Sequence, residues 1–292
     1  MTNHFPVIGY VGSDPIFRLL IGPSLDLGVN LLHLPSSTDV ERLREFARQC
    51  NILLHQEGVL SISTIRTLEA EGFLLRPSSA ALEYATVRNT RASENLGEKE
   101  SRSHISVLVS RSPHNQCSVW TPTQMVRIIS ITPAEGLSEN ASMRAQKTAL
   151  EIAEELGLVG VMSVEILVDH DEIEIGQVRV HLTLAGNWTL EGSRTSQYEQ
   201  HLRAILDLPL GDPTMRSPFA VSATFQSGTK SNMYRPYLHL MARSPTLKFH
   251  QYRSEGDGTT PQGHVTAVGD DLVDLLQCVN HAIDYMSGAV DE

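Results

Sequence analysis

The run Pro6-Val7-Ile8-Gly9-Tyr10-Val11, closed by Gly12, predicts a short buried strand, and residues 15–27 after it predict a helix. Further strand patterns, each separated from the last by a helical pattern, lie at 30–34, 52–55 and 74–76. Strands that alternate with helices of this length are typical of βαβ units around a parallel sheet. The first ninety residues therefore predict a Rossmann-like domain.

Past residue 90 the pattern changes. Residues 91–103 are polar and lack periodicity, which predicts a linker. Strand patterns then accompany a helix at 138–156, and they lie at 104–110, 126–132, 159–168 and 178–183. Antiparallel strands covered by a helix make an α+β unit. The predicted organisation is a Rossmann-like domain at 1–90, a linker at 91–103, an α+β domain at 104–212 and a small C-terminal α/β lobe at 213–292.

Charge and cysteine content narrow the functional classes. The 292 residues carry 23 Lys and Arg against 34 Asp and Glu, a net charge of −11, and no Lys/Arg-rich run. Nucleic acid and anionic membranes are therefore poor partners. No apolar stretch approaches the roughly 18–20 residues that span a bilayer, and the N-terminus lacks the pattern of a signal peptide. Three widely spaced cysteines predict unpaired thiols, so we expect a cytoplasmic protein.

The densest motif of the chain is Gly186-Asn187-Trp188-Thr189-Leu190-Glu191-Gly192. The accompanying motifs are Ile105-Ser106-Val107-Leu108-Val109, Leu156-Gly157-Leu158-Val159-Gly160-Val161, Val164-Glu165, 195–204, Leu208-Pro209-Leu210-Gly211-Asp212 and Gly263-His264-Val265-Thr266. Together and in this order they resemble PurK, the carboxyaminoimidazole ribonucleotide synthases of the ATP-grasp superfamily. The resemblance runs from about residue 7 to 286. It implies a Rossmann-like pre-ATP-grasp domain, an ATP-grasp antiparallel sheet and a homodimer that uses the helix around Tyr198 and His201.

The chain departs from this family where ATP would bind. The family's lid domain, with a lysine over the phosphates, should lie between Arg88 and Ile105, where this chain has only the predicted linker. Of the two family carboxylates that hold magnesium, the first aligns with Glu165 and the second with Gln177, a neutral amide. Hard cations need oxygen ligands and charge compensation. The resemblance thus implies a divergent, lid-less paralogue with a degenerate ATP site, no cofactor and no metal. Glu165 is alternatively a solvated or ion-paired strand residue.

The substrate loops depart as well. His181 stands where the family has an arginine, Leu184 lies in the formerly polar centre of that loop, and Phe17 lies in the former phosphate loop. The expected catalytic residues are His181 and Glu165, which would move a proton. The expected substrate-binding residues are Phe17, Arg88, Gln177, Leu184 and Trp188. The alternatives are that His181 faces solvent, that Trp188 anchors the core and that His201 is structural.

Three functions are open. The first is a repurposed cytoplasmic enzyme of specialised metabolism that no longer uses ATP and acts on a small, less charged molecule as a cyclase, isomerase or other proton-transfer catalyst. The second is a non-catalytic dimeric pseudoenzyme that binds a ligand or serves as a scaffold. The third is a residual carboxyaminoimidazole ribonucleotide synthase of purine biosynthesis.

Overall fold

The computed structural model describes residues 5–35, 37, 39–95, 102–169, 172–225, 234–252 and 261–289. In the described N-terminal part, β1 (Val7–Val11), β2 (Asn30–Leu34), β3 (Ile52–His55) and β4 (Leu75–Arg76) form a parallel sheet in the order β2-β1-β3-β4. The connecting helices are α1 (Asp14–Asp26), α2 (Val40–Ala47) and α3 (Ile62–Ala70). All of β3 is buried, as expected of a parallel strand covered on both faces. The predicted Rossmann-like domain is confirmed.

The predicted linker is partly helical. Helix α4 (Ser79–Asn95) continues through the first five of its residues, and β5 (Ser103–Arg111) already includes the last. The helix needs no apolar stripe there because Arg91 lies on its exposed side. The central residues, 96–101, lie outside the described ranges. The stretch 96–102 that joins α4 to β5 is too short for a lid built from a strand and a helix, since such units need about 30 residues.

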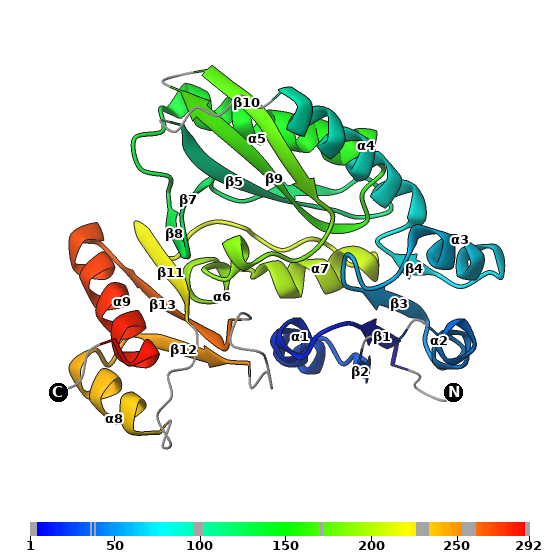
Figure 1. Cartoon of the computed structure of the whole chain (residues 1–292), viewed down its shortest axis with the longest axis horizontal. Coiled ribbons are helices and arrows are strands. Elements are labelled where there is room, and N and C mark those ends of the chain that lie inside the picture. Colours follow the sequence, from blue (N-terminus) through cyan, green and yellow to red (C-terminus); the bar gives the residue numbers. More distant parts are fainter. Residues whose placement is uncertain are drawn as a thin grey trace.

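The second sheet is antiparallel and runs through most of the chain (Figure 1). Within the described ranges its strands lie in the order β10-β9-β5-β7-β8-β11-β13-β12, with β6 paired to β5. Their bounds are β6 (Cys117–Val119), β7 (Thr123–Val126), β8 (Ile129–Thr132), β9 (Gly160–Asp169), β10 (Glu172–Arg179), β11 (Phe219–Phe225), β12 (Lys248–Gln251) and β13 (Gly263–Gly269). Because β8 pairs with β11, the expected C-terminal lobe is not a separate sheet.

Helices cover this sheet in two groups. Helix α5 (Glu139–Glu155) packs on β5 and β9 through a buried face of Ala141, Ala145, Ala149, Ile152 and Ala153. Helix α9 (Leu272–Ser287) packs on β11 and β13, and α8 (Tyr234–Arg243) packs against α9. No helix in the described ranges is long and apolar enough to cross a membrane. All three cysteines are free thiols, as predicted.

One helix joins the two sheets. Helix α7 (Gln197–Ile205) packs against α1 on one side and β9 on the other, and Figure 1 shows it between the sheets. Buried residues of both parts share one apolar cluster, in which Ile8 and Tyr10 of β1 join Trp188 and Leu202. The two parts therefore share a core, and the loops that border their junction are held in fixed positions.

Candidate functional site

A cavity of about 520 Å³ lies at the junction of the two sheets. Its walls come from the loops after β1 and β3, from β5, β9 and β10, and from the 181–185 segment that follows β10. The lining residues that carry the argument below are Ser13, Gln56, Glu165, Arg179, His181 and Leu184. Ligands of α/β proteins collect at the carboxyl ends of parallel strands, which is where the loops after β1 and β3 lie. The predicted crevice is thus a real cavity.

Two of those loops are tied together at the cavity rim. Gln56, directly after β3, accepts hydrogen bonds from the Ser13 backbone N–H and the Ser13 hydroxyl, both at 2.8 Å. Ser13 precedes α1, whose first turn contains Pro15. The loop that aligns with the family's phosphate loop is therefore closed by a side-chain contact within this chain.

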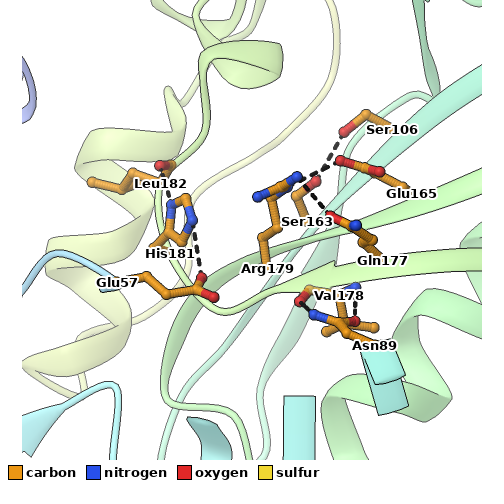
Figure 2. A network of polar contacts seen from close by, with 10 residues as sticks. All are labelled: Glu57, Asn89, Ser106, Ser163, Glu165, Gln177, Val178, Arg179, His181 and Leu182. Atoms are coloured by element: carbon orange, nitrogen blue, oxygen red, sulfur yellow. Dashed lines mark hydrogen bonds and ion pairs between the residues drawn. The ribbon is translucent and has the colours of Figure 1, made fainter. Parts of the chain in front are cut away.

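Arg179 dominates the β9–β10 wall. Its Nε lies 3.0 Å from Oε1 of Glu165, and its Nη2 donates to Oε1 of Gln177 at 2.7 Å. Figure 2 shows the guanidinium next to both side chains. Residues 177 and 179 alternate along one strand and so project from the same face, toward Glu165 on the neighbouring strand. A positive charge thus pairs with the Glu165 carboxylate, and the ion-paired alternative for Glu165 is confirmed.

His181 has a different acidic partner. Its Nε2 lies 3.0 Å from Oε2 of Glu57, a residue of the loop after β3, and its Nδ1 lies 2.7 Å from the carbonyl oxygen of Leu182 (Figure 2). Burial opposes ionisation of Glu57, but His181 and Arg179 together hold the pKa of this carboxyl below its usual value. Glu57 is therefore a carboxylate at neutral pH. His181 and Glu165 both line the cavity, but each is engaged by another side chain.

Only some of the predicted substrate-binding residues lie at the cavity. Leu184 lines the cavity and is 45% exposed. Gln177 does not line the cavity, but its Oε1 accepts a hydrogen bond from Arg179, which does. The expectation that Phe17 borders the cavity is wrong, because its ring stacks on His33 with centroids 4.2 Å apart.

The expectation that Arg88 and Trp188 border the cavity is also wrong. Arg88 lies on α4, beside Tyr84 and Glu155, and faces a separate surface hollow. Trp188 is completely buried in the shared core, so its alternative role as a core anchor is confirmed.

Trp188→Ala is expected to lower the free energy of unfolding by about 3–5 kcal/mol, the usual cost of removing a large buried aromatic side chain. Gly192 contributes to this tight packing, since a Cβ there would lie 2.8 Å from Cε3 of Trp188. Urea denaturation measures the loss. Leu184→Ala, at the half-exposed cavity position, is the control and should cost less than about 1 kcal/mol. A loss below about 1 kcal/mol for Trp188→Ala would contradict the assignment to the core.

His201 is structural, as expected. It is buried on α7, and its Nδ1 accepts a hydrogen bond from the Val161 N–H at 3.0 Å. Burial, with a smaller contribution from His181, lowers the pKa of His201 to about 4. The side chain is therefore neutral in the folded protein at physiological pH.

Stability is expected to fall as the pH drops from about 6.5 to 4. In that window the unfolded chain protonates His201 while the folded chain does not, so protons favour unfolding. The loss from this residue is about 3 kcal/mol. Urea denaturation at several pH values checks this, and His201→Gln, which cannot titrate, should show a shallower pH dependence. Equal slopes for both proteins would contradict the assignment.

The expected homodimer stays a prediction, but its rationale changes. Tyr198, Gln200 and His201 of α7 are buried within the single chain. Their retention is therefore explained by packing between the two sheets, without a second subunit.

Sequence analysis did not single out several residues of the cavity. Arg179 was detectable, because it lies two residues after Gln177 on a predicted strand and so shares its face. Glu57, which contacts His181 but is not part of the cavity lining, was detectable as well, because it follows the carboxyl end of a predicted parallel strand. Tyr252 lines the cavity from the chain beyond β12, and no local pattern places it there.

Comparisons with known proteins agree on the family. Residues 99–198 match the ATP-grasp domain. The N5-carboxyaminoimidazole ribonucleotide synthase of Mycobacterium tuberculosis H37Rv is 34% identical over 195 residues, which cover 64% of this chain and 46% of the relative. That of Escherichia coli K12 is 30% identical over 159 residues, which cover 52% and 42%. In these matches the chain spans less than half the length of its curated relatives.

Solved structures show the same fold. The synthetase of Thermus thermophilus superposes with a TM-score of 0.81 at 21% identity, covering 98% of this chain and 99% of that one. The Aspergillus clavatus synthase, in complex with ADP and 5-aminoimidazole ribonucleotide, superposes with a TM-score of 0.82 at 17% identity, covering 97% and 98%. Residues 99–198 of the chain therefore match the ATP-grasp domain, and the chain is similar in sequence and in fold to PurK, the N5-carboxyaminoimidazole ribonucleotide synthases.

Proposed function

We propose that this chain is a residual N5-carboxyaminoimidazole ribonucleotide synthase, which binds an aminoimidazole ribonucleotide in the cavity and uses ATP slowly. The observation that carries this proposal is the 34% identity to such synthases over 195 residues. A structural neighbour, the Aspergillus clavatus synthase, holds both ADP and 5-aminoimidazole ribonucleotide. The cavity of this chain lies within the fold that the two proteins share.

The charge of the cavity suits a phosphorylated ligand. Two arginines, Arg127 and Arg179, line it, and Glu165 is the one acidic residue among its described lining. A guanidinium has five N–H donors. Arg179 directs its Nε at Glu165 and its Nη2 at Gln177. Charge-assisted hydrogen bonds from such groups recognise phosphate and carboxylate oxygens. An anionic ribonucleotide would be held more strongly here than a neutral molecule of the same size.

The groups that would bind Mg-ATP in such a reaction are incomplete in this chain. The short connection between α4 and β5 leaves no room for a strand–helix lid. Gln177 and the Arg179–Glu165 ion pair stand where two free carboxylates would hold magnesium. Losing one group that stabilises the transition state typically costs roughly 10²–10³-fold in rate. Slow turnover rather than efficient catalysis follows from this combination.

Calorimetric titration with 5-aminoimidazole ribonucleotide tests the proposed substrate. We expect saturable binding that Arg179→Ala weakens at least tenfold, because the main cation of the β9–β10 wall is lost. Arg66→Ala, which removes an exposed ion pair with Glu83 far from the cavity lining, is the matched control and should bind as the parent does. Absence of binding, or equal affinity of the Arg179→Ala variant, would count against the proposal.

A second candidate is ATP-independent proton transfer, such as a cyclisation or isomerisation, on a less charged molecule. The contact of His181 with Glu57 at the cavity favours it, because a histidine oriented by a carboxylate is a common acid–base arrangement. Apolar lining by Ile16, Leu19, Leu182 and Leu184 would accommodate an uncharged body. Turnover of a cavity ligand in the absence of ATP would select this candidate. Ligand binding without any turnover would select a non-catalytic protein.

A further inference from the structure

A second cluster of polar side chains lies beside the cavity, where β12 and β13 meet α6 (Thr189–Gly192). His250 of β12 lies directly opposite His264 of β13 in the antiparallel register, and their rings stack with centroids 4.4 Å apart. Glu191 of α6 brings its Oε1 to 2.8 Å from Nε2 of His250. One ligand atom from each of the three residues lies within 4.8 Å of the others.

The ion pair between Glu191 and His250 does not satisfy the cluster. His264 is completely buried, and its Nε2 has no hydrogen-bond partner among the described residues. Oε2 of Glu191 is also buried and lacks a hydrogen-bond partner in the same ranges. Leaving a buried polar atom unpaired costs about 1–3 kcal/mol. A bound cation would engage both atoms at once.

The chemistry of His264 suits a metal ligand. His264 is completely buried, which favours the neutral imidazole, and a neutral imidazole has a lone pair to donate to a metal. Its Nδ1 lies 2.6 Å from the hydroxyl of Tyr252. A metal-binding histidine typically donates its other N–H to an oxygen, which fixes the ring orientation. Tyr252 is placed to accept that hydrogen bond.

The neighbouring amide permits this tautomer. Nδ2 of Asn187 donates to the hydroxyl of Tyr252 at 3.0 Å, and the hydroxyl of Tyr198 donates to Oδ1 of Asn187 at 2.7 Å. An amide can take either of two flipped orientations, since its oxygen and nitrogen are nearly the same in shape. In the flipped orientation the hydroxyl of Tyr252 donates to Oδ1 of Asn187 and accepts a hydrogen bond from Nδ1 of His264. The lone pair of His264 then lies on Nε2, which has no hydrogen-bond partner among the described residues.

We propose that Glu191, His250 and His264 form a binding site for a divalent transition metal of the zinc class. Two imidazole nitrogens and one carboxylate oxygen are a common ligand set for zinc, with a fourth position for water. Ligand atoms in a tetrahedral zinc site lie about 3.3 Å apart, and each imidazole binds in its own ring plane, so metal binding requires His250 and His264 to rotate out of their stacked arrangement. The soft nitrogen donors disfavour magnesium and calcium, which prefer oxygen. The site is independent of the proposed synthase activity.

The metal site borders the cavity through Tyr252, whose side chain lines the cavity and whose hydroxyl contacts His264. An occupied site would therefore hold one cavity wall in place, and would also connect β12, β13 and α6. We expect zinc to stabilise the fold, because a ligand that binds only the folded state raises its melting temperature.

Zinc titration of the chelator-stripped protein, by calorimetry and by competition with a chromophoric chelator, tests the proposal. We expect one equivalent bound with a micromolar or lower Kd, and a melting temperature that rises with zinc. His250→Ala and Glu191→Gln change partly exposed positions, and each should weaken binding at least tenfold, the usual scale for such losses. Substitution of Co²⁺ should give the visible absorption of a four- or five-coordinate site in the parent protein and not in His250→Ala.

Two control variants locate the metal. His281 lies 3.2 Å from His239 in a separate histidine pair between α8 and α9, and His114 is exposed beside Asp207. His281→Ala and His114→Ala should bind zinc as the parent does. Loss of binding in His281→Ala with retention in His250→Ala would overturn the proposal, as would the absence of stoichiometric zinc. Circular dichroism on every variant confirms that it is folded.

Discussion

Titration with Mg-ATP is expected to show no saturation in the micromolar range, with any binding confined to millimolar concentrations. The chain has no room for a lid between α4 and β5, and Arg179 neutralises Glu165. Each tenfold loss of affinity corresponds to about 1.4 kcal/mol, so a shift from micromolar to millimolar needs only about 4 kcal/mol. Missing phosphate contacts and an unfavourable charge at the magnesium position together account for that amount.

Calorimetry measures this affinity, with the synthase of Mycobacterium tuberculosis titrated in parallel as the positive control. The variant Gln177→Glu separates the two causes, because it supplies the second carboxylate without adding a lid. We expect it to improve Mg-ATP binding by tenfold or less. Micromolar affinity of the unmodified protein would contradict this account of the site.

His181→Ala and Glu165→Gln are each expected to reduce turnover by about 10²–10⁴-fold while the protein stays folded. Both side chains line the cavity, and each contacts a side chain of opposite type: His181 contacts Glu57, and Glu165 pairs with Arg179. Removing His181 leaves Glu57 without the imidazole that contacts its Oε2, and removing the charge of Glu165 leaves Arg179 unbalanced. Both changes alter the charges that face a bound ligand.

Matched controls exist for both variants. His114→Ala removes an exposed histidine that also pairs with a carboxylate, and Glu151→Gln removes an exposed glutamate paired with Lys147. Steady-state rates of all four variants are compared, with and without ATP, since an effect that persists without ATP points to proton-transfer chemistry. Rates within twofold of the parent for His181→Ala and Glu165→Gln would show that these groups merely line the cavity.

Local patterns predicted the local elements well. The apolar run at β1, closed by Gly12, and the alanine stripe of α5 depend on periodicity within a few residues, which the sequence carries directly. Helix α4 was not predicted, and its end was assigned to the linker because Thr90–Asn95 has helix-forming residues but no apolar stripe. An exposed helical turn and a polar linker look alike in composition.

Pairing between strands that are far apart in the sequence was harder to predict. The pairing of β8 with β11 joins strands about ninety residues apart, and it makes one sheet from what the sequence divided at residue 213. No periodicity within either strand indicates its partner. Likewise, the proposed metal ligands come from three different elements, so no spacing motif in the sequence predicts the cluster of Glu191, His250 and His264.

The residues of the candidate site were likewise predicted only in part. Glu165, His181 and Leu184 line the cavity as expected, since strand alternation and loop position determine where they project. Phe17 and Trp188 were placed there because of their loops, but their side chains turn into apolar packing instead. Burial of aromatic area favours that choice, and sequence adjacency cannot reveal it.

The central claim is that the chain is a residual synthase, and its most direct test is ribonucleotide-dependent ADP release. Protein, Mg-ATP and bicarbonate are incubated with and without 5-aminoimidazole ribonucleotide, and ADP is followed by a coupled assay. We predict slow release that requires the ribonucleotide, roughly 10³-fold or more below that of the Mycobacterium tuberculosis synthase, and that falls to background in Glu165→Gln. ADP release that is the same with and without the ribonucleotide, or the same in Glu165→Gln as in the parent, would contradict the claim.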